Sequence, residues 1–137
     1  MDEHSQDGPT RREQGLDMYR RVYGDEAFVF EEGRSDFFDL MLSQLFGEVW
    51  SRPALEVSDR RLLVMGVLAA QRAFDTLSIQ FSRALDSGEL GVEQIREIAI
   101  HLIPYVGYPS SSDLYRVSET AIVGFEKSQR DAGATGE

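Results

Sequence analysis

The sequence predicts an all-α protein, and three observations lead to this prediction. Apolar residues recur at intervals of three and four along most of the chain, which is the spacing of one helix face. No segment alternates strictly between apolar and polar residues, as a half-buried strand does. Serine, glycine and proline separate the apolar stretches where helices commonly begin and end. With 137 residues, we expect a single compact domain of about six helices.

The first two helices are expected in residues 10–24 and 35–49. In the first, Leu16, Tyr19 and Tyr23 fall on one face, and Gly24 suits the position after a helix end. Ser35 can cap the second helix. The apolar residues of this second helix are Phe38, Leu42, Leu45 and Phe46. Pro53 then disfavours helix at the residue before it.

Three or four more helices are expected after Pro53. Ser58 can cap the next one, and the apolar stretch from Leu62 to Ala70 predicts that it is buried, whereas Arg60 and Arg61 are expected on a solvated face. A further helix ends near Gly88. Residues 92–106 are the clearest amphipathic segment, and a last helix follows the serines at 110–112. We place the domain at 10–126, between a flexible N-terminus at 1–9 and a flexible C-terminal tail at 127–137.

Composition excludes several classes of partner and site. The net charge of −10 opposes binding to nucleic acid or to an anionic membrane. No stretch approaches the roughly 20 apolar residues of a membrane-spanning helix, and the N-terminus lacks a signal sequence, so we expect a cytoplasmic protein. The absence of cysteine excludes disulfides and thiolate ligands, and the two histidines and scattered acids show no spacing for a metal site.

His101 is the residue best suited to proton transfer. His4 is close to the N-terminus, and imidazole is the side chain that ordinarily titrates near neutral pH. Glu97, His101 and Tyr105 follow one another at four-residue intervals, so they share one stripe of a helix. Two interpretations remain open on this pattern. His101 is either an acid–base group beside a kink at Pro104, or a structural histidine bonded to Glu97 in a helix that Pro104 ends early.

A second candidate group lies in the segment FGEVWSRP, residues 46–53. If the helix continues, Glu48 and Arg52 meet as an ion pair; if it ends at Gly47, both project from a loop beside Trp50. Arginine is well suited to bind a substrate carboxylate. The alternative is a surface ion pair beside a core tryptophan. Gln80, among apolar residues, is either a buried amide or a hydrogen-bond donor to a pocket.

Three segments together resemble the γ-carboxymuconolactone decarboxylase family: residues 15–30, 46–70 and 81–119. The matching positions are Trp50, Ser51, Arg52, Pro53 and Leu55; Ala84, Leu85 and Gly88; Ile95, Arg96 and Glu97; and His101, Tyr105, Gly107 and Pro109. The resemblance implies the all-α alkylhydroperoxidase-like fold and assembly into a homo-oligomer, a trimer or hexamer. It also implies decarboxylation of an enolisable lactone through a dienolate, with no cofactor, because the lactone accepts the electrons.

The resemblance also implies roles for individual residues. His101 would supply the proton, with Glu48 as the second catalytic residue. Arg52 would bind a carboxylate, and Trp50, Gln80 and Tyr105 would complete the substrate pocket. Gln80 stands where decarboxylases of this family tend to have a second histidine, and the CxxC pair of the related peroxidases is missing, so peroxidase activity is not expected. The substrate can therefore be another lactone or a keto acid.

Two alternatives to a decarboxylase follow from these differences between the sequence and the family pattern. The first is a repurposed member of the family that cyclises, isomerises or dehydrates a polyketide-like substrate. The second is a non-catalytic helical module that kept the fold for binding or assembly.

Overall fold

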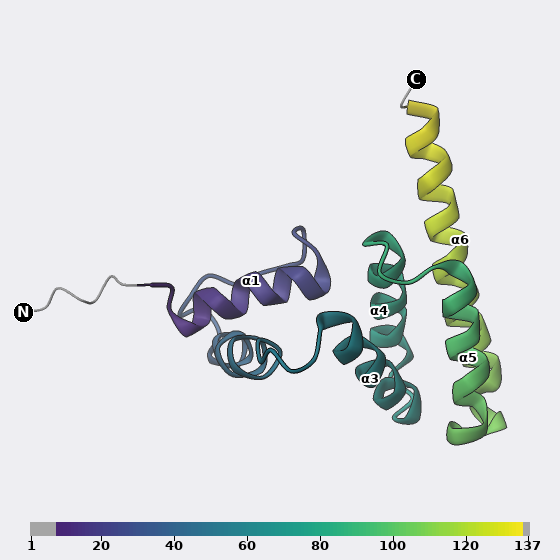
Figure 1. Ribbon diagram of the computed structural model, residues 1–137, viewed down its shortest axis with the longest axis horizontal. Helices are drawn as coiled ribbons and strands as arrows, with labels where there is room; N and C mark the ends of the chain where they lie inside the picture. Colours follow the sequence, from purple (N-terminus) through teal and green to yellow (C-terminus); the bar gives the residue numbers. More distant parts are fainter. Residues whose placement is uncertain (1–7, 136–137) are drawn as a thin grey trace, which may run out of the picture. The chain divides into compact units, whose positions relative to one another are not determined.

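The computed structural model describes residues 8–135, and within that range it contains helices and no strand. This confirms the predicted all-α class (Figure 1). The helices, in chain order, are α1 (Arg11–Tyr23), α2 (Asp36–Leu40), the π-helix η2 (Met41–Val49), α3 (Val57–Ala70), α4 (Phe74–Asp86), α5 (Val92–Val106), the 3-10 helix η3 (Tyr108–Ser110) and α6 (Ser111–Thr135).

The chain forms two compact units that meet in sequence between Arg60 and Arg61, in the first turn of α3. We call them the N-terminal unit and the C-terminal unit and describe each by itself. The predicted N-terminal segment 1–9 falls almost entirely outside the described residues, as does His4.

In the N-terminal unit, α1 packs against η2 at very short range. Thr10 caps α1 by accepting a hydrogen bond from the Glu13 amide, and Gly24 follows its last residue, as predicted. Gly15 of α1 lies directly against the backbone of Leu42, where a Cβ would lie 2.6 Å from the Leu42 carbonyl carbon and closer still to its oxygen. Gly47 makes the matching approach from η2, because its Cβ would lie 2.5 Å from the Arg11 carbonyl oxygen.

Aromatic side chains fill the space beside this crossing. Tyr19 contacts the edges of Phe38 and Phe46, with ring centroids 5.6 and 5.4 Å away. Phe46 in turn packs on Trp50, 5.8 Å away. The second predicted helix is therefore present to its predicted end at Val49, but its later part is a π-helix, with the Trp50 amide bonded five residues back to Leu45.

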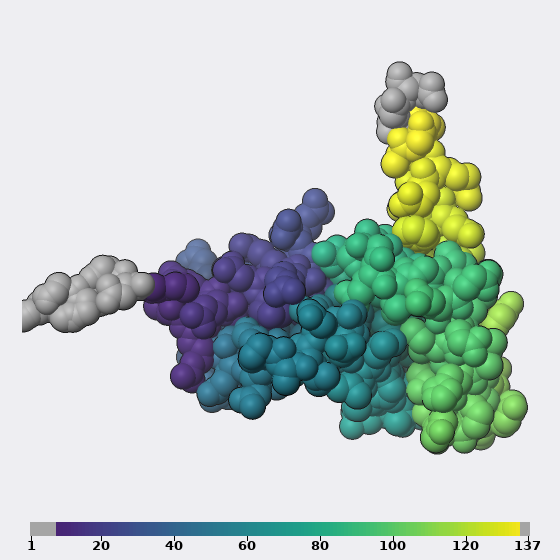
Figure 2. All heavy atoms as spheres, in the orientation of Figure 1, coloured from purple at the N-terminus to yellow at the C-terminus, as the bar shows by residue number. Residues whose placement is uncertain are grey.

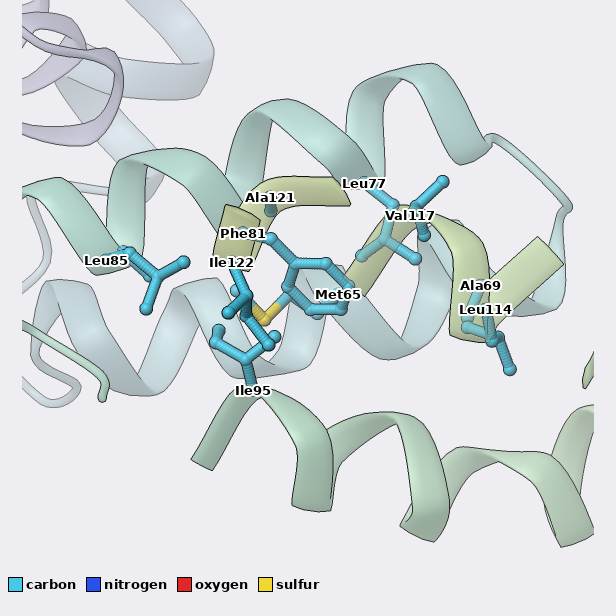
Figure 3. Close-up of a cluster of buried hydrophobic side chains, with 11 residues drawn as sticks. Met65, Ala69, Leu77, Phe81, Leu85, Ile95, Leu114, Val117, Ala121 and Ile122 are labelled. Atoms are coloured by element: carbon cyan, nitrogen blue, oxygen red, sulfur yellow. The ribbon is translucent and has the colours of Figure 1, made fainter. Parts of the chain in front are cut away.

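The core of the C-terminal unit is a cluster of eleven buried side chains from α3, α4, α5 and α6, shown in Figure 3. Met65, Leu77, Phe81, Ile95 and Leu114 are fully buried within it. The short connections after Ala70 and Asp86 return the chain so that these faces meet. Phe81 and Met65 lie side by side near the centre of the view.

The prediction that α3 is a buried helix was wrong, because several of its apolar side chains are exposed in the single chain. The helix begins at Val57, one residue before the predicted cap at Ser58. Its apolar residues point in several directions, so Met65 and Ala69 enter the core whereas others remain exposed. The exposed fractions are 44% for Leu62, 62% for Leu63 and 53% for Val67.

The predicted C-terminal tail is helical instead as far as the structure describes it. α6 continues to Thr135, and residues 126–134 are exposed along it. Figure 2 shows the last turns of α6 standing clear of the rest of the C-terminal unit. Among residues 8–135, no helix combines the length and the apolar character needed to cross a membrane.

Candidate active site

A pocket of about 460 Å³ opens beside α5 in the C-terminal unit. Its lining residues are Leu62 from α3, Leu90 from the connection before α5, and Gln94, Glu97, Ile98, His101 and Leu102 from α5. Four of these seven side chains are aliphatic, and the polar ones are an amide, a carboxylate and an imidazole. The pocket therefore combines apolar walls with a small group of side chains able to bind or transfer protons.

Local sequence explains why α5 presents these groups together. The Gln94 side chain accepts a hydrogen bond from the Gly91 amide at 2.9 Å, which satisfies a free amide at the start of the helix. Ile95 and Ala99 are buried in the core. Since Gln94, Glu97 and His101 recur at three and four residues, they form the neighbouring stripe, at the edge of that buried face.

His101 is exposed at the pocket wall, and the alternative interpretation, a structural histidine bonded to Glu97, was wrong. Its ring packs on Tyr105 one turn later, with centroids 5.3 Å apart and planes at 42°. Within the part of the chain that the structure describes, neither a hydrogen bond nor an ion pair joins His101 to Glu97. The imidazole nitrogens are thus available to a ligand.

Pro104 lies inside α5 and does not end it early, because the helix continues to Val106. Proline has no amide hydrogen to donate to the Ile100 carbonyl, which is the usual partner of residue 104 in a helix. The helix resumes its bonding at Gly107, whose amide donates to the Ile103 carbonyl at 2.8 Å. The missing bond therefore falls on the turn that carries His101.

Gln80 is a buried amide, the first of its two predicted alternatives. It is 1% exposed in α4, and its Oε1 accepts a hydrogen bond from Arg61 at 2.7 Å. The second Arg61 partner is Glu89, whose Oε2 lies 2.7 Å from Nε. Arg61 itself is fully buried, so its predicted place on a solvated face was wrong. Gln80 does not line the pocket beside His101.

The residues of the WSRP segment belong to the N-terminal unit. Trp50 is a core residue, 7% exposed, as its packing on Phe46 requires. Glu48 and Arg52 do not form the ion pair that was expected if the helix continued, because η2 winds more widely than an α-helix and ends at Val49. Glu48 instead lies 3.7 Å from Arg11, with both side chains more than half exposed. The Arg52 carbonyl accepts a hydrogen bond from Arg60 at 3.0 Å, and its own side chain is exposed.

The six predicted site residues therefore fall into two groups. The first group belongs to the C-terminal unit, where His101 and Tyr105 contact each other and Gln80 is buried away from them. The second group belongs to the N-terminal unit and consists of Glu48, Trp50 and Arg52, which lie close in sequence. A joint site built from both groups stays a prediction. Among residues 8–135, no three His, Cys, Asp or Glu side chains lie close enough to hold a metal ion.

Sequence reasoning missed Gln94, Leu62 and Leu90 as pocket residues. Gln94 had a usable signal, because it precedes His101 by seven residues and thus extends the stripe that Glu97 and His101 define. Leu62 and Leu90 carried no comparable signal. Their place in the wall depends on how α3 and the connection before α5 pack in three dimensions.

The model of the carboxymuconolactone decarboxylase family matches residues 35–120. This range covers more than half of the chain, and it contains η2 with the WSRP segment as well as the pocket on α5. The chain therefore belongs to the carboxymuconolactone decarboxylase family, as the sequence motifs indicated.

Two relatives found by comparison carry the names of decarboxylases. Nitrosuccinic acid decarboxylase npaB of Metarhizium robertsii is 32% identical over 84 residues, which cover 61% of this chain and 58% of npaB. The 4-carboxymuconolactone decarboxylase of Acinetobacter baylyi is 27% identical over 114 residues, covering 80% of this chain and 84% of that protein. The chain thus spans less than two thirds of npaB. Family membership and both relatives support an enzyme of the carboxy-lyase kind.

Proposed function

We propose that this protein is a cofactor-free decarboxylase of a small carboxylic acid that carries its own electron-accepting group. The observation that carries the proposal is the exposed His101 at the wall of a largely apolar pocket, with Glu97 one turn before it and Tyr105 against its ring. The names of both relatives describe acids of this kind, one with a nitro group and one with a lactone.

The reaction needs an electron acceptor and a proton, and the substrate and His101 can supply them. The bond between the carboxylate carbon and its neighbour breaks, carbon dioxide leaves, and the electron pair moves onto an oxygen of the lactone, keto or nitro group. The resulting enolate or nitronate carbon then takes a proton from the His101 imidazolium, which recovers a proton from water. Electrons and protons balance without a cofactor.

The pocket walls favour this step physically. A carboxylate beside Leu62, Leu90, Ile98 and Leu102 loses part of its hydration, whereas the delocalised carbanion suffers less from that loss. The Tyr105 ring restricts the orientation of the imidazole. The proposal rests on the C-terminal unit alone, and the roles that the family resemblance implies for Arg52, Glu48 and Trp50, which belong to the N-terminal unit, are not part of it. Gln80 is buried away from this pocket, and its amide cannot transfer a proton as a histidine can.

The test is carbon dioxide release from a panel of 4-carboxymuconolactone, nitrosuccinate and a β-keto acid. We expect His101→Ala to lower turnover by at least about 100-fold, the usual minimum for a general acid or base, with an unchanged circular-dichroism spectrum. Glu93→Gln is the matched control, because Glu93 is on the same helix and its side chain is 91% exposed. Full activity in His101→Ala would refute the role of His101. An absence of turnover with the whole panel would favour a non-catalytic module.

We also propose that the protein acts as a homo-oligomer, a trimer or hexamer. The exposed apolar side chains of α3, Leu62, Leu63 and Val67, support the proposal, because a helix face of this kind is stabilised when another surface covers it. Sedimentation equilibrium at micromolar concentration measures the assembly directly. A mass near the 15.5 kDa of one chain would contradict the proposal.

A further inference from the structure

The guanidinium of Arg61 is held rigidly inside the C-terminal unit. Its side chain is fully buried at the start of α3, and two of its three nitrogens are anchored from different parts of the chain. Nε donates to Glu89, which follows α4, and one terminal nitrogen donates to Gln80 within α4, both at 2.7 Å. Because the two bonds fix the plane of the group, the direction of the third nitrogen is fixed as well.

That third nitrogen, Nη2, is buried and has no hydrogen-bond partner among residues 8–135. It carries two N–H donors on a charged group. Buried polar atoms in native proteins nearly always have a partner, and an unpaired charged donor is especially costly. The structure therefore indicates an acceptor that comes from outside the described chain.

Charge and shape identify the kind of acceptor. Gln80 is neutral, and Glu89 bonds to Nε alone, so no anionic group contacts Nη2 among residues 8–135. A guanidinium matches the planar oxygens of a carboxylate better than any other common group. A carboxylate oxygen is thus the acceptor that best matches the two free N–H donors of Nη2.

Arg61 adjoins the candidate active site in sequence, although neither Arg61 nor Glu89 itself lines the pocket. Leu62 and Leu90, which line the pocket, directly follow Arg61 and Glu89 in sequence. The residues that line this pocket include no lysine or arginine. We propose that the side chains of Leu62 and Leu90 move apart when the ligand enters, because they lie beside the covered Nη2 in sequence, and that a carboxylate of the ligand then reaches Nη2, which makes Arg61 a substrate-binding residue. The inference rests on the proposed function for the identity of the ligand.

Binding of succinate to the full chain, measured by calorimetry, tests the inference. Succinate carries two carboxylates and no electron-accepting group, so it binds without reacting, and succinamide is its neutral counterpart. We expect succinate to bind more tightly than succinamide and Arg61→Gln to weaken succinate binding at least about tenfold. We expect Glu89→Gln to strengthen it at least about threefold, because Arg61 then keeps its bond to an amide oxygen but loses its counter-charge.

Opposite effects of these two variants separate ligand binding from a structural role. If the ion pair only maintained the fold, both substitutions would weaken binding alike, and that result would overturn the inference. Equal binding of succinate by wild type and Arg61→Gln, or equal binding of succinate and succinamide by wild type, would also overturn it and leave water as the acceptor. Should Arg61→Gln fail to fold, Glu89→Gln decides, since it retains Arg61. Arg116→Gln, exposed on α6 and paired with Asp113, is the control and should leave binding unchanged.

The same experiment distinguishes this inference from the proposed function. Succinate binding that depends on Arg61, in a protein that releases no carbon dioxide from any acid of the panel, would refute the decarboxylase and retain the carboxylate site. Decarboxylation with an unchanged KM in Arg61→Gln would retain the enzyme and refute the site.

Discussion

Replacement of Gly15 by alanine should destabilise the N-terminal unit, although alanine is the better helix former. Gly15 lies in the middle of α1, where the exchange by itself favours the helix by about 1 kcal/mol. Against this, the new Cβ would lie 2.6 Å from the Leu42 carbonyl carbon and 3.0 Å from the Gly47 nitrogen. Both are backbone atoms, which cannot rotate away as a side chain can.

The size of the expected loss of stability follows from the movement that would relieve this clash. Relief requires α1 and η2 to separate, which opens the packing around Met18, Leu42 and Phe46, all buried at this crossing. Inserting a methyl group into a packed core costs about 1–3 kcal/mol, and a backbone clash belongs at the upper end or beyond. After the gain in helix propensity, we expect the free energy of unfolding to fall by at least about 2 kcal/mol.

Urea unfolding followed by tryptophan fluorescence measures this loss of stability in the N-terminal unit, where Gly15 lies. The chain has one tryptophan, Trp50, which is buried in the N-terminal unit. Gly124→Ala, followed by circular dichroism because Gly124 lies in the C-terminal unit, is the control for helix propensity, since Gly124 is also helical but has no atom within 4 Å of an added Cβ. We expect that variant to be more stable by up to about 1 kcal/mol. A Gly15→Ala protein as stable as the wild type would refute the close helix crossing.

Two further predictions concern single interactions. Pro104→Ala should raise the free energy of unfolding by about 1–3 kcal/mol, because alanine restores a donor to the Ile100 carbonyl inside α5. Urea titration followed by circular dichroism measures this free energy, and a less stable variant would contradict the argument. Hydrogen bonds from the Gly33 amide and from Arg12 lower the pKa of Asp39 below 3.8. Its stabilising effect is therefore complete well above pH 3.8 and is lost as the pH falls through the lowered value. The difference in free energy of unfolding between wild type and Asp39→Asn should accordingly be largest near neutral pH and shrink in acid. A difference that stays constant down to about pH 2–3 would count against the ion pair between Arg12 and Asp39.

The positions of most helices could be predicted from the sequence alone. The clearest case is α5, predicted at 92–106 and observed at Val92–Val106, because its apolar spacing and the glycines at both ends act within a few residues of each other. Gly24 ended α1 for the same reason. The stripe that carries Glu97, His101 and Tyr105 also follows from helix geometry, and so does the family, since its motifs are linear.

Burial and partners were decided by the tertiary structure. The sequence pattern placed Arg61 in water and Leu62 to Ala70 in a core, whereas packing buries Arg61 between Gln80 and Glu89 and leaves Leu63 exposed. The sequence pattern left open whether Glu48 pairs with Arg52 on a continuing helix or projects from a loop, whereas in the structure Glu48 lies by Arg11 at the end of a π-helix. The physical reason is the same in each case. Helix formation depends on neighbours along the chain, but the environment of a side chain depends on segments tens of residues away, whose approach no local pattern records.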